Sequence, residues 1–154
     1  MRIHELVRSQ VVPRDRDEVF AFFANAENLE AMTPPWLRFR IVTTLPIEMR
    51  TGTRIDYVLR LHGIPLHWTS EITAWEPPFR FVDEQVRGPY RLWKHEHRFE
   101  MVSGGTRVID TVHYAVPGGP MVHRLFVAPD LERVFEFRKE RLGARFGSAP
   151  GRND

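Results

Sequence analysis

The chain of 154 residues contains no cysteine. This absence excludes a disulfide framework, a thiolate nucleophile and a cysteine-ligated metal site. No apolar run approaches the roughly 20 residues that a membrane-spanning helix needs. The first residues, Met1 to Glu5, lack the apolar segment of a signal peptide. We therefore expect a cytoplasmic protein without a transmembrane segment.

An excess of charge of one sign is also missing. Acidic and basic residues are interleaved along the chain, and the formal net charge is only +2. A nucleic-acid-binding surface usually appears as a basic patch or stripe, so we expect no nucleic-acid partner. Each serine lacks the G-x-S-x-G setting of a hydrolase nucleophile, which removes that class of enzyme.

Glycine and proline divide the chain into short segments with clear periodicity. Alternating apolar and polar residues predict seven strands, over 4–12, 37–44, 53–62, 66–76, 80–87, 90–102 and 106–116. Helical spacing predicts two short helices, over 16–25 and 27–36, the first capped by Asp15 or Asp17, and one long helix from about 120 to 142. Pro129 should kink or split that long helix.

This order of elements predicts an α+β fold. A long antiparallel meander has one apolar face, and the C-terminal helix is the natural element to cover it. A strongly curved sheet around one helix leaves an internal cavity. We expect a single domain over 1–146 and a disordered tail over 147–154, because the tail has the composition of unstructured segments.

The segment WKHEHRFE, Trp93 to Glu100, carries the clearest functional signal. Strict alternation places Trp93, His95, His97 and Phe99 on one face, and four charged residues on the other. The charged face must meet water. Two histidines therefore share the buried face with aromatic rings.

Glycine-containing turns allow two hairpins to be registered. A loop at Gly63-Ile64 pairs Tyr57 with Ser70, Leu59 with Trp68 and Asp56 with Glu71.

A loop at Gly104-Gly105 pairs His97 with Val112 and brings Asp110 to the same face as His97. Because a buried carboxylate needs a partner, we predict a His97–Asp110 pair. For strand 80–87 the sequence leaves open whether Phe81, Asp83 and Gln85 or Val82, Glu84 and Val86 face inward.

Several runs of the chain resemble a known family: GTRIDYVLRLHGIPLHW, WEPP, GPYRLWKHEHRFE and GGTRVIDTVHY. Over about residues 3–142 the chain is similar to bacterial members of the SRPBCC superfamily, the START, polyketide cyclase and birch-pollen-allergen-like proteins. The resemblance implies a helix-grip fold, a curved seven-stranded sheet around a long C-terminal helix. Members of the superfamily include ligand binders, lipid carriers and aromatase/cyclases, so the resemblance does not choose among these activities.

We interpret the inward face as a pocket for a hydrophobic or aromatic small molecule. Its ligand-binding residues would be Tyr57, Leu59, Trp68, Ser70, Trp93, His95, Phe99 and Val112. Apolar residues of the terminal helix should close the cavity: Met121, Val122, Leu125, Phe126, Val134, Phe135 and Phe137. The sequence gives no prediction of oligomeric state.

Two alternatives remain open. In a cyclase or dehydratase, His97 oriented by Asp110 would be the general base, and Tyr114 or Tyr57 would polarise a carbonyl. In an interaction protein the cavity would be incidental. A metal held by His95, His97 and Asp110 is disfavoured, since no third inward histidine exists; we expect no metal and no cofactor.

Overall fold

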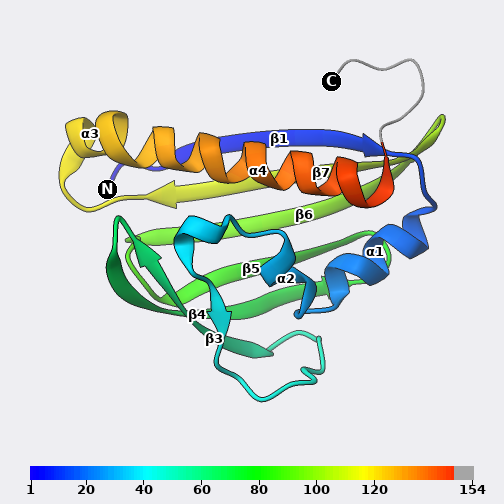
Figure 1. Ribbon diagram of the computed structural model, residues 1–154, viewed down its shortest axis with the longest axis horizontal. Helices are drawn as coiled ribbons and strands as arrows, with labels where there is room; N and C mark the ends of the chain where they lie inside the picture. Colours follow the sequence, from blue (N-terminus) through cyan, green and yellow to red (C-terminus); the bar gives the residue numbers. More distant parts are fainter. Residues whose placement is uncertain (148–154) are drawn as a thin grey trace.

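The computed structural model describes residues 1–147 as one curved antiparallel sheet with helices on its concave face (Figure 1). The seven strands follow the order β1-β7-β6-β5-β4-β3-β2. Their bounds are β1 His4–Val12, β2 Arg40–Ile41, β3 Arg54–Leu61, β4 Ile64–Glu76, β5 Arg80–Arg87, β6 Leu92–Val102 and β7 Gly105–Ala115. The helix-grip prediction is confirmed. Of the predicted tail, 147–154, all but Gly147 lies outside the described residues.

The first connection, between β1 and β2, forms short helices. α1 spans Arg16–Ala24, with Asp15 at its N-cap position, and α2 spans only Asn28–Ala31. A 3-10 turn, η1 (Pro35–Leu37), follows because Pro34 and Pro35 cannot continue a helix. The strand predicted over 37–44 is correspondingly reduced to the two residues of β2.

The C-terminal helical segment runs without a gap from α3 (Gly119–Val122) through η2 (His123–Val127) to α4 (Ala128–Phe146). The expected interruption at Pro129 takes the form of a π-helical turn, in which the Ala128 N–H donates to the His123 carbonyl. This wider turn precedes the proline, whose ring would clash with a regular helical turn.

The expectation that Met121, Leu125 and Phe126 help close the cavity is wrong. All three are more than half exposed, because α3 and η2 extend past the end of β7 (Figure 1). Val134 and Phe135, one to two turns into α4, do line the cavity. Phe137 is half-buried and packs edge-on against Trp36.

Both predicted hairpin registers are shifted by two residues, although every face assignment survives. The first turn is His62-Gly63, with φ of 51° and 80°. β-Branched Ile64 disfavours this left-handed conformation, so it starts β4 instead. Tyr57 now lies opposite Trp68. The shift also replaces the poor Asp56–Glu71 pair with Asp56–Thr69 and Arg54–Glu71 pairs.

The second turn is Ser103-Gly104, which places His97 directly opposite Asp110. Gly105 is the first residue of β7, and a Cβ there would lie 2.0 Å from the Val12 carbonyl oxygen of β1. Only glycine permits this approach, so Gly105 sets where the β6–β7 pairing begins.

The 13 residues of β4 pair with β5 through two register shifts, at Thr69/Ser70 and Ile72/Ala74. Such irregularities bend a strand and increase its twist. The bent sheet then has two separate apolar clusters. One lies under α1 and the end of α4 around Phe20, Phe99 and Leu142, and the other lies under the start of α4 around Val112 and Phe135.

In the part of the chain that the structure describes, we find no helix with both the length and the apolar character needed to cross a bilayer.

We expect Gly105→Ala to lower the free energy of unfolding by about 3 kcal/mol or more, since the new methyl group meets a backbone carbonyl. Gly104→Ala is the matched control. Gly104 also has a positive φ (89°) but has open space around its Cβ position, so it should cost only about 1 kcal/mol. Urea denaturation measures both; equal losses would contradict the steric role of Gly105.

Candidate functional site

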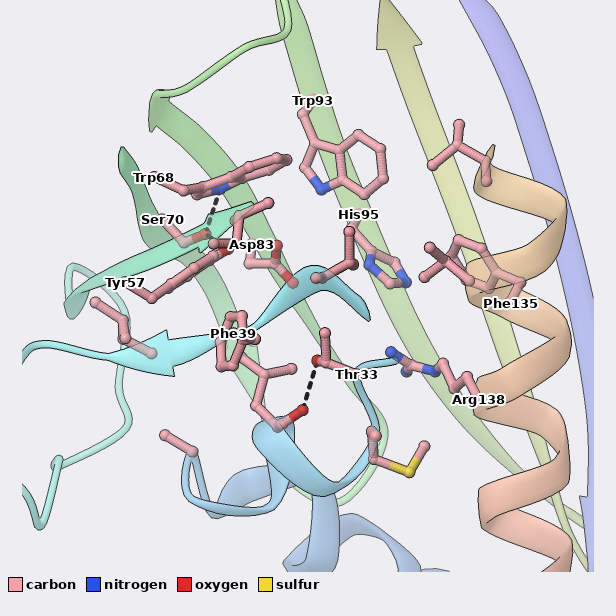
Figure 2. Close-up of a pocket in the computed structure, with 18 of the residues that line it drawn as sticks. Thr33, Phe39, Tyr57, Trp68, Ser70, Asp83, Trp93, His95, Phe135 and Arg138 are labelled. Atoms are coloured by element: carbon pink, nitrogen blue, oxygen red, sulfur yellow. Dashed lines mark hydrogen bonds between the residues drawn. The ribbon is translucent and has the colours of Figure 1, made fainter. Parts of the chain in front are cut away.

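A cavity of about 690 Å³ lies between the concave face of the sheet and the helices (Figure 2). Strands β3 to β6 supply one wall, and α1, α2 and α4 supply the other. β7 contributes no lining residue, because α4 covers its inward side chains. The principal residues that line the cavity are Phe23, Met32, Phe39, Tyr57, Leu59, Trp68, Ser70, Asp83, Tyr90, Trp93, His95, His97, Val134, Phe135 and Arg138.

One end of the cavity is aromatic, and there the polar atoms of Tyr57, Trp68 and Ser70 pair with one another. The Ser70 hydroxyl accepts a hydrogen bond from Trp68 Nε1 at 3.0 Å and lies 2.9 Å from the Tyr57 hydroxyl. Burial, with a contribution from the Asp83 charge, raises the pKa of Tyr57 well above its usual value. Tyr57 therefore stays a neutral phenol. Trp68 also packs edge-on against Trp93, with ring centroids 5.5 Å apart.

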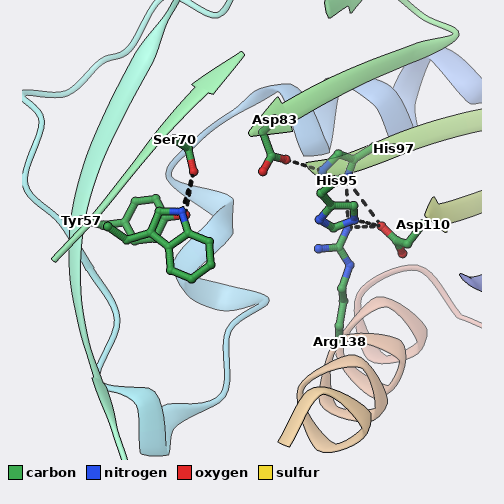
Figure 3. A network of polar contacts seen from close by, with 8 residues as sticks. Tyr57, Ser70, Asp83, His95, His97, Asp110 and Arg138 are labelled. Carbon is green, nitrogen blue, oxygen red and sulfur yellow. Dashed lines mark hydrogen bonds and ion pairs between the residues drawn. The ribbon is translucent and has the colours of Figure 1, made fainter. Parts of the chain in front are cut away.

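The middle of the cavity carries a buried polar cluster (Figure 3). The alternation of β6 brings His95 and His97 to the concave face, where their rings stack at 3.7 Å. Asp110 of β7 lies behind them, Asp83 of β5 lies beside them, and Arg138 reaches across from α4. Each carboxylate is hydrogen-bonded to one histidine.

His97 is fully engaged by its neighbours. Its Nε2 lies 2.7 Å from Asp83 Oδ2, and Arg138 Nη2 approaches its Nδ1 at 3.3 Å. Arginine can only donate, so Nδ1 must be the acceptor and Nε2 must carry the proton that Asp83 accepts. Burial and the neighbouring His95 lower the pKa of His97 to about 4. His97 is thus a neutral imidazole with no free nitrogen.

His95 has a different arrangement. Its Nε2 lies 2.8 Å from Asp110 Oδ1, which also accepts a hydrogen bond from Arg138 Nη2 at 2.9 Å. Burial opposes ionisation of Asp110, but the charge of Arg138 and the bond from His95 outweigh it and hold the pKa of Asp110 well below its usual range. The ionised Asp110 therefore accepts the Nε2 proton of His95. In the neutral imidazole, the nitrogen with the lone pair is then His95 Nδ1, on the cavity side (Figure 3).

Comparison with known proteins agrees with this architecture. Residues 12–142 match the model of the family described as polyketide cyclase / dehydrase and lipid transport. The chain belongs to this polyketide cyclase family. This family is of the SRPBCC type, the superfamily whose members the sequence motifs resemble. No curated protein matches the chain.

Solved structures of the polyketide cyclase fold superpose on nearly the whole chain. The Zhui aromatase/cyclase from Streptomyces sp. R1128 is 14% identical, with a TM-score of 0.73 and coverage of 94% of this chain and 93% of that one. The ginseng major latex-like protein 151 from Panax ginseng is 11% identical, with a TM-score of 0.69 and coverage of 94% and 97%. A protein from Thermus thermophilus, TTHA0849, is 19% identical, with a TM-score of 0.68 and coverage of 92% and 99%. At these identities the likeness establishes the fold alone.

The structure brings most of the predicted site residues of this family member together. Tyr57, Leu59, Trp68, Ser70, Trp93, His95 and His97 all line the cavity.

Four predicted residues do not line the cavity. Phe99 is buried under α1, where Phe20 packs against it at 5.2 Å. Val112 and Asp110 lie beneath α4. The Tyr114 hydroxyl lies 2.7 Å from His123 Nε2 and shares a hydrogen bond with it, outside the cavity wall.

The predicted His97–Asp110 pair is replaced by two pairs. His97 Nδ1 and Asp110 Oδ1 lie 3.5 Å apart, yet the hydrogen bonds run from His95 to Asp110 and from His97 to Asp83. The reason is that β5 presents Phe81 and Asp83 inward, the alternative that the sequence left open, and this supplies a second carboxylate.

Arg138 was not predicted, although the sequence contains a signal for it. Leu131, Phe135, Arg138 and Leu142 follow helical spacing, and all four are buried. An arginine on an apolar helical stripe needs a buried acid. Asp110 is that acid.

A metal site would use Asp83, His95 and His97, whose ligand atoms all lie within 4.8 Å of one another. The arrangement does not suit an ion. The two imidazoles stack nearly parallel, with 24° between their planes, so their lone pairs do not converge on one point. Metal at His97 Nε2 would also need a proton on Nδ1, where Arg138 donates.

We expect Arg138→Met to lower the free energy of unfolding by about 3 kcal/mol, because Asp110 would keep its burial but lose its cation. Arg141→Met, on the exposed side of the same helix, is the control and should stay within about 0.5 kcal/mol of the wild type.

The pH dependence gives a second readout. The folded pKa of Asp110 lies below the unfolded value of about 3.9, so its stabilisation is present above that pH and is lost as the pH falls toward the folded pKa. The difference in the free energy of unfolding between the wild type and Arg138→Met should therefore shrink below about pH 4. A difference that stays constant in acid would contradict the ion pair.

Proposed function

We propose that this polyketide cyclase family member binds a hydrophobic small molecule with a flat aromatic part in the cavity. The observation that carries the proposal is the composition of the wall. A volume of about 690 Å³ is surrounded mainly by aromatic and aliphatic side chains, with a few polar groups gathered at one place. Ligand sites of proteins have this volume and this balance of surfaces.

The aromatic end fits the flat part of such a ligand. Tyr57 and Trp68 stack with ring centroids 5.9 Å apart and 16° between their planes, and Trp93 stands perpendicular to Trp68. The polar atoms of Tyr57 and Trp68 are already bonded within the Tyr57–Ser70–Trp68 group. Contact there is therefore by ring faces and edges, which favours an aromatic ligand over a flexible polar one.

We expect Val134→Trp to weaken binding of the uncharged dye prodan at least about tenfold, since a larger side chain on α4 would fill the cavity. Val7→Trp is the matched control, because Val7 is 48% exposed on β1 and lies away from the cavity. Dye fluorescence measures affinity, and thermal melting verifies that both variants fold. Unchanged binding by a folded Val134→Trp protein would remove the cavity as the binding site.

A second candidate function is acid–base catalysis on a carbonyl compound, as in a cyclase or dehydratase. The observation that favours it is the His95–Asp110 pair: a carboxylate holds Nε2–H while Nδ1 is left on the cavity side. This is the arrangement of an oriented general base. It assigns to His95 the role that the sequence assigned to His97, whose two nitrogens are occupied.

We expect the protein to accelerate deuterium exchange at the central carbon of 1-phenylbutane-1,3-dione, followed by NMR in D2O. His95→Gln should reduce this exchange on the order of a hundredfold, and His97→Gln should keep it within about tenfold of the wild type. Equal losses in both variants would contradict the assignment of His95 as the base.

A further inference from the structure

The polar cluster presents unused hydrogen-bond acceptors to the cavity. Asp83 bonds His97 through Oδ2, and its other oxygen points toward the aromatic end (Figure 3). His95 bonds Asp110 through Nε2, which leaves Nδ1 as an acceptor on the same side. A ligand group that pairs with these two atoms must therefore donate hydrogen bonds.

The charges of the cluster are unevenly compensated. Arg138 sits against Asp110 at 2.9 Å, so these two charges offset each other. Within residues 1–147, the side-chain partner of Asp83 is His97 alone, and burial together with the neighbouring His95 lowers the pKa of His97 and keeps it neutral. Burial opposes ionisation of Asp83, but the hydrogen bond from His97 and the nearby His95 and Arg138 keep the pKa of Asp83 below its usual value. Asp83 and Asp110 are thus two carboxylates beside the single guanidinium of Arg138, which contacts Asp110, so the excess negative charge of these three groups is located on Asp83.

The surroundings of Asp83 suit an organic cation. Tyr57, Trp68 and Trp93 line the cavity (Figure 2), and the free Asp83 oxygen points toward the side where Tyr57 lies (Figure 3). Ring faces attract ammonium groups, and a carboxylate among aromatic rings binds them more strongly than either feature alone. A metal ion fits less well, because the lone pairs of the two stacked imidazoles do not converge on one point.

We propose that the ligand of this cavity carries a protonated amine, which donates hydrogen bonds to Asp83 and His95 while its aromatic part lies against Tyr57, Trp68 and Trp93. The proposal rests on the proposed function and names its ligand class, an aromatic amine with a basic nitrogen. It assigns Asp83 as the residue that selects this class.

Three probes of nearly equal size test the proposal on the wild-type protein. They are 1-naphthylmethylamine, 1-naphthalenemethanol and 1-ethylnaphthalene, titrated at pH 7 and followed by tryptophan fluorescence and calorimetry. We expect the amine to bind about tenfold more tightly than either neutral probe, because its charge-assisted hydrogen bond is made in a partly desolvated site.

Two variants then locate the effect. Asp83→Asn should reduce the affinity for the amine about tenfold and leave that for 1-ethylnaphthalene unchanged. Glu84→Gln, the neighbouring acid on β5 outside the cavity lining, removes the same formal charge and should change neither affinity. Thermal melting verifies folding, and the probe series on the wild type decides the question even where Asp83→Asn fails to fold.

The outcomes separate the two proposals. Failure of all three probes to bind would overturn both the proposed function and the amine. Neutral probes that bind as tightly as the amine would overturn the amine alone and leave the cavity as a hydrophobic site. Saturable binding of Zn²⁺ that displaces the amine and is lost in Asp83→Asn would also overturn it, and would assign the cluster to a metal.

Discussion

The contact between Arg138 and Asp110 is the interaction on which the site depends. It connects α4 to β7 through a buried ion pair. A buried pair is strongly destabilising when one member is lost. The same guanidinium determines the tautomer of His97, and the same carboxylate determines that of His95. Helix position and proton positions are therefore set by one contact.

The cavity follows from the way the sheet is covered. α4 packs on β1 and β7, and α1 packs on the opposite ends of the strands near Phe99, so neither helix fills the concavity above β3 to β6. The unfilled space then has two surfaces of different chemistry. At the aromatic end Tyr57, Ser70 and Trp68 pair their polar atoms with one another, whereas Asp83 and His95 of the polar cluster keep acceptors unpaired. This asymmetry suits a ligand with one flat apolar part and one hydrogen-bonding group.

Much of the fold was predictable, because alternation in strands and helical spacing are local properties of the chain. Face assignment also survived a register error, since a shift of two residues leaves every side chain on its original face. The errors arose where a distant contact decides. Gly105 meets Val12 of β1, and Met121, Leu125 and Phe126, which were expected to close the cavity, extend past the end of the sheet. Neither arrangement has a local signature in the sequence.

By itself, the sequence determined that His95 and His97 share a buried face with aromatic residues and that this face belongs to a helix-grip sheet. Only the tertiary structure decided their partners. Asp83 comes from a strand whose inward face was ambiguous in the sequence, and Arg138, on α4, lies 28 residues beyond Asp110 in the chain. The physical reason is that periodicity specifies the direction of a side chain, whereas a hydrogen bond depends on the distance between atoms of different elements. Packing alone sets that distance.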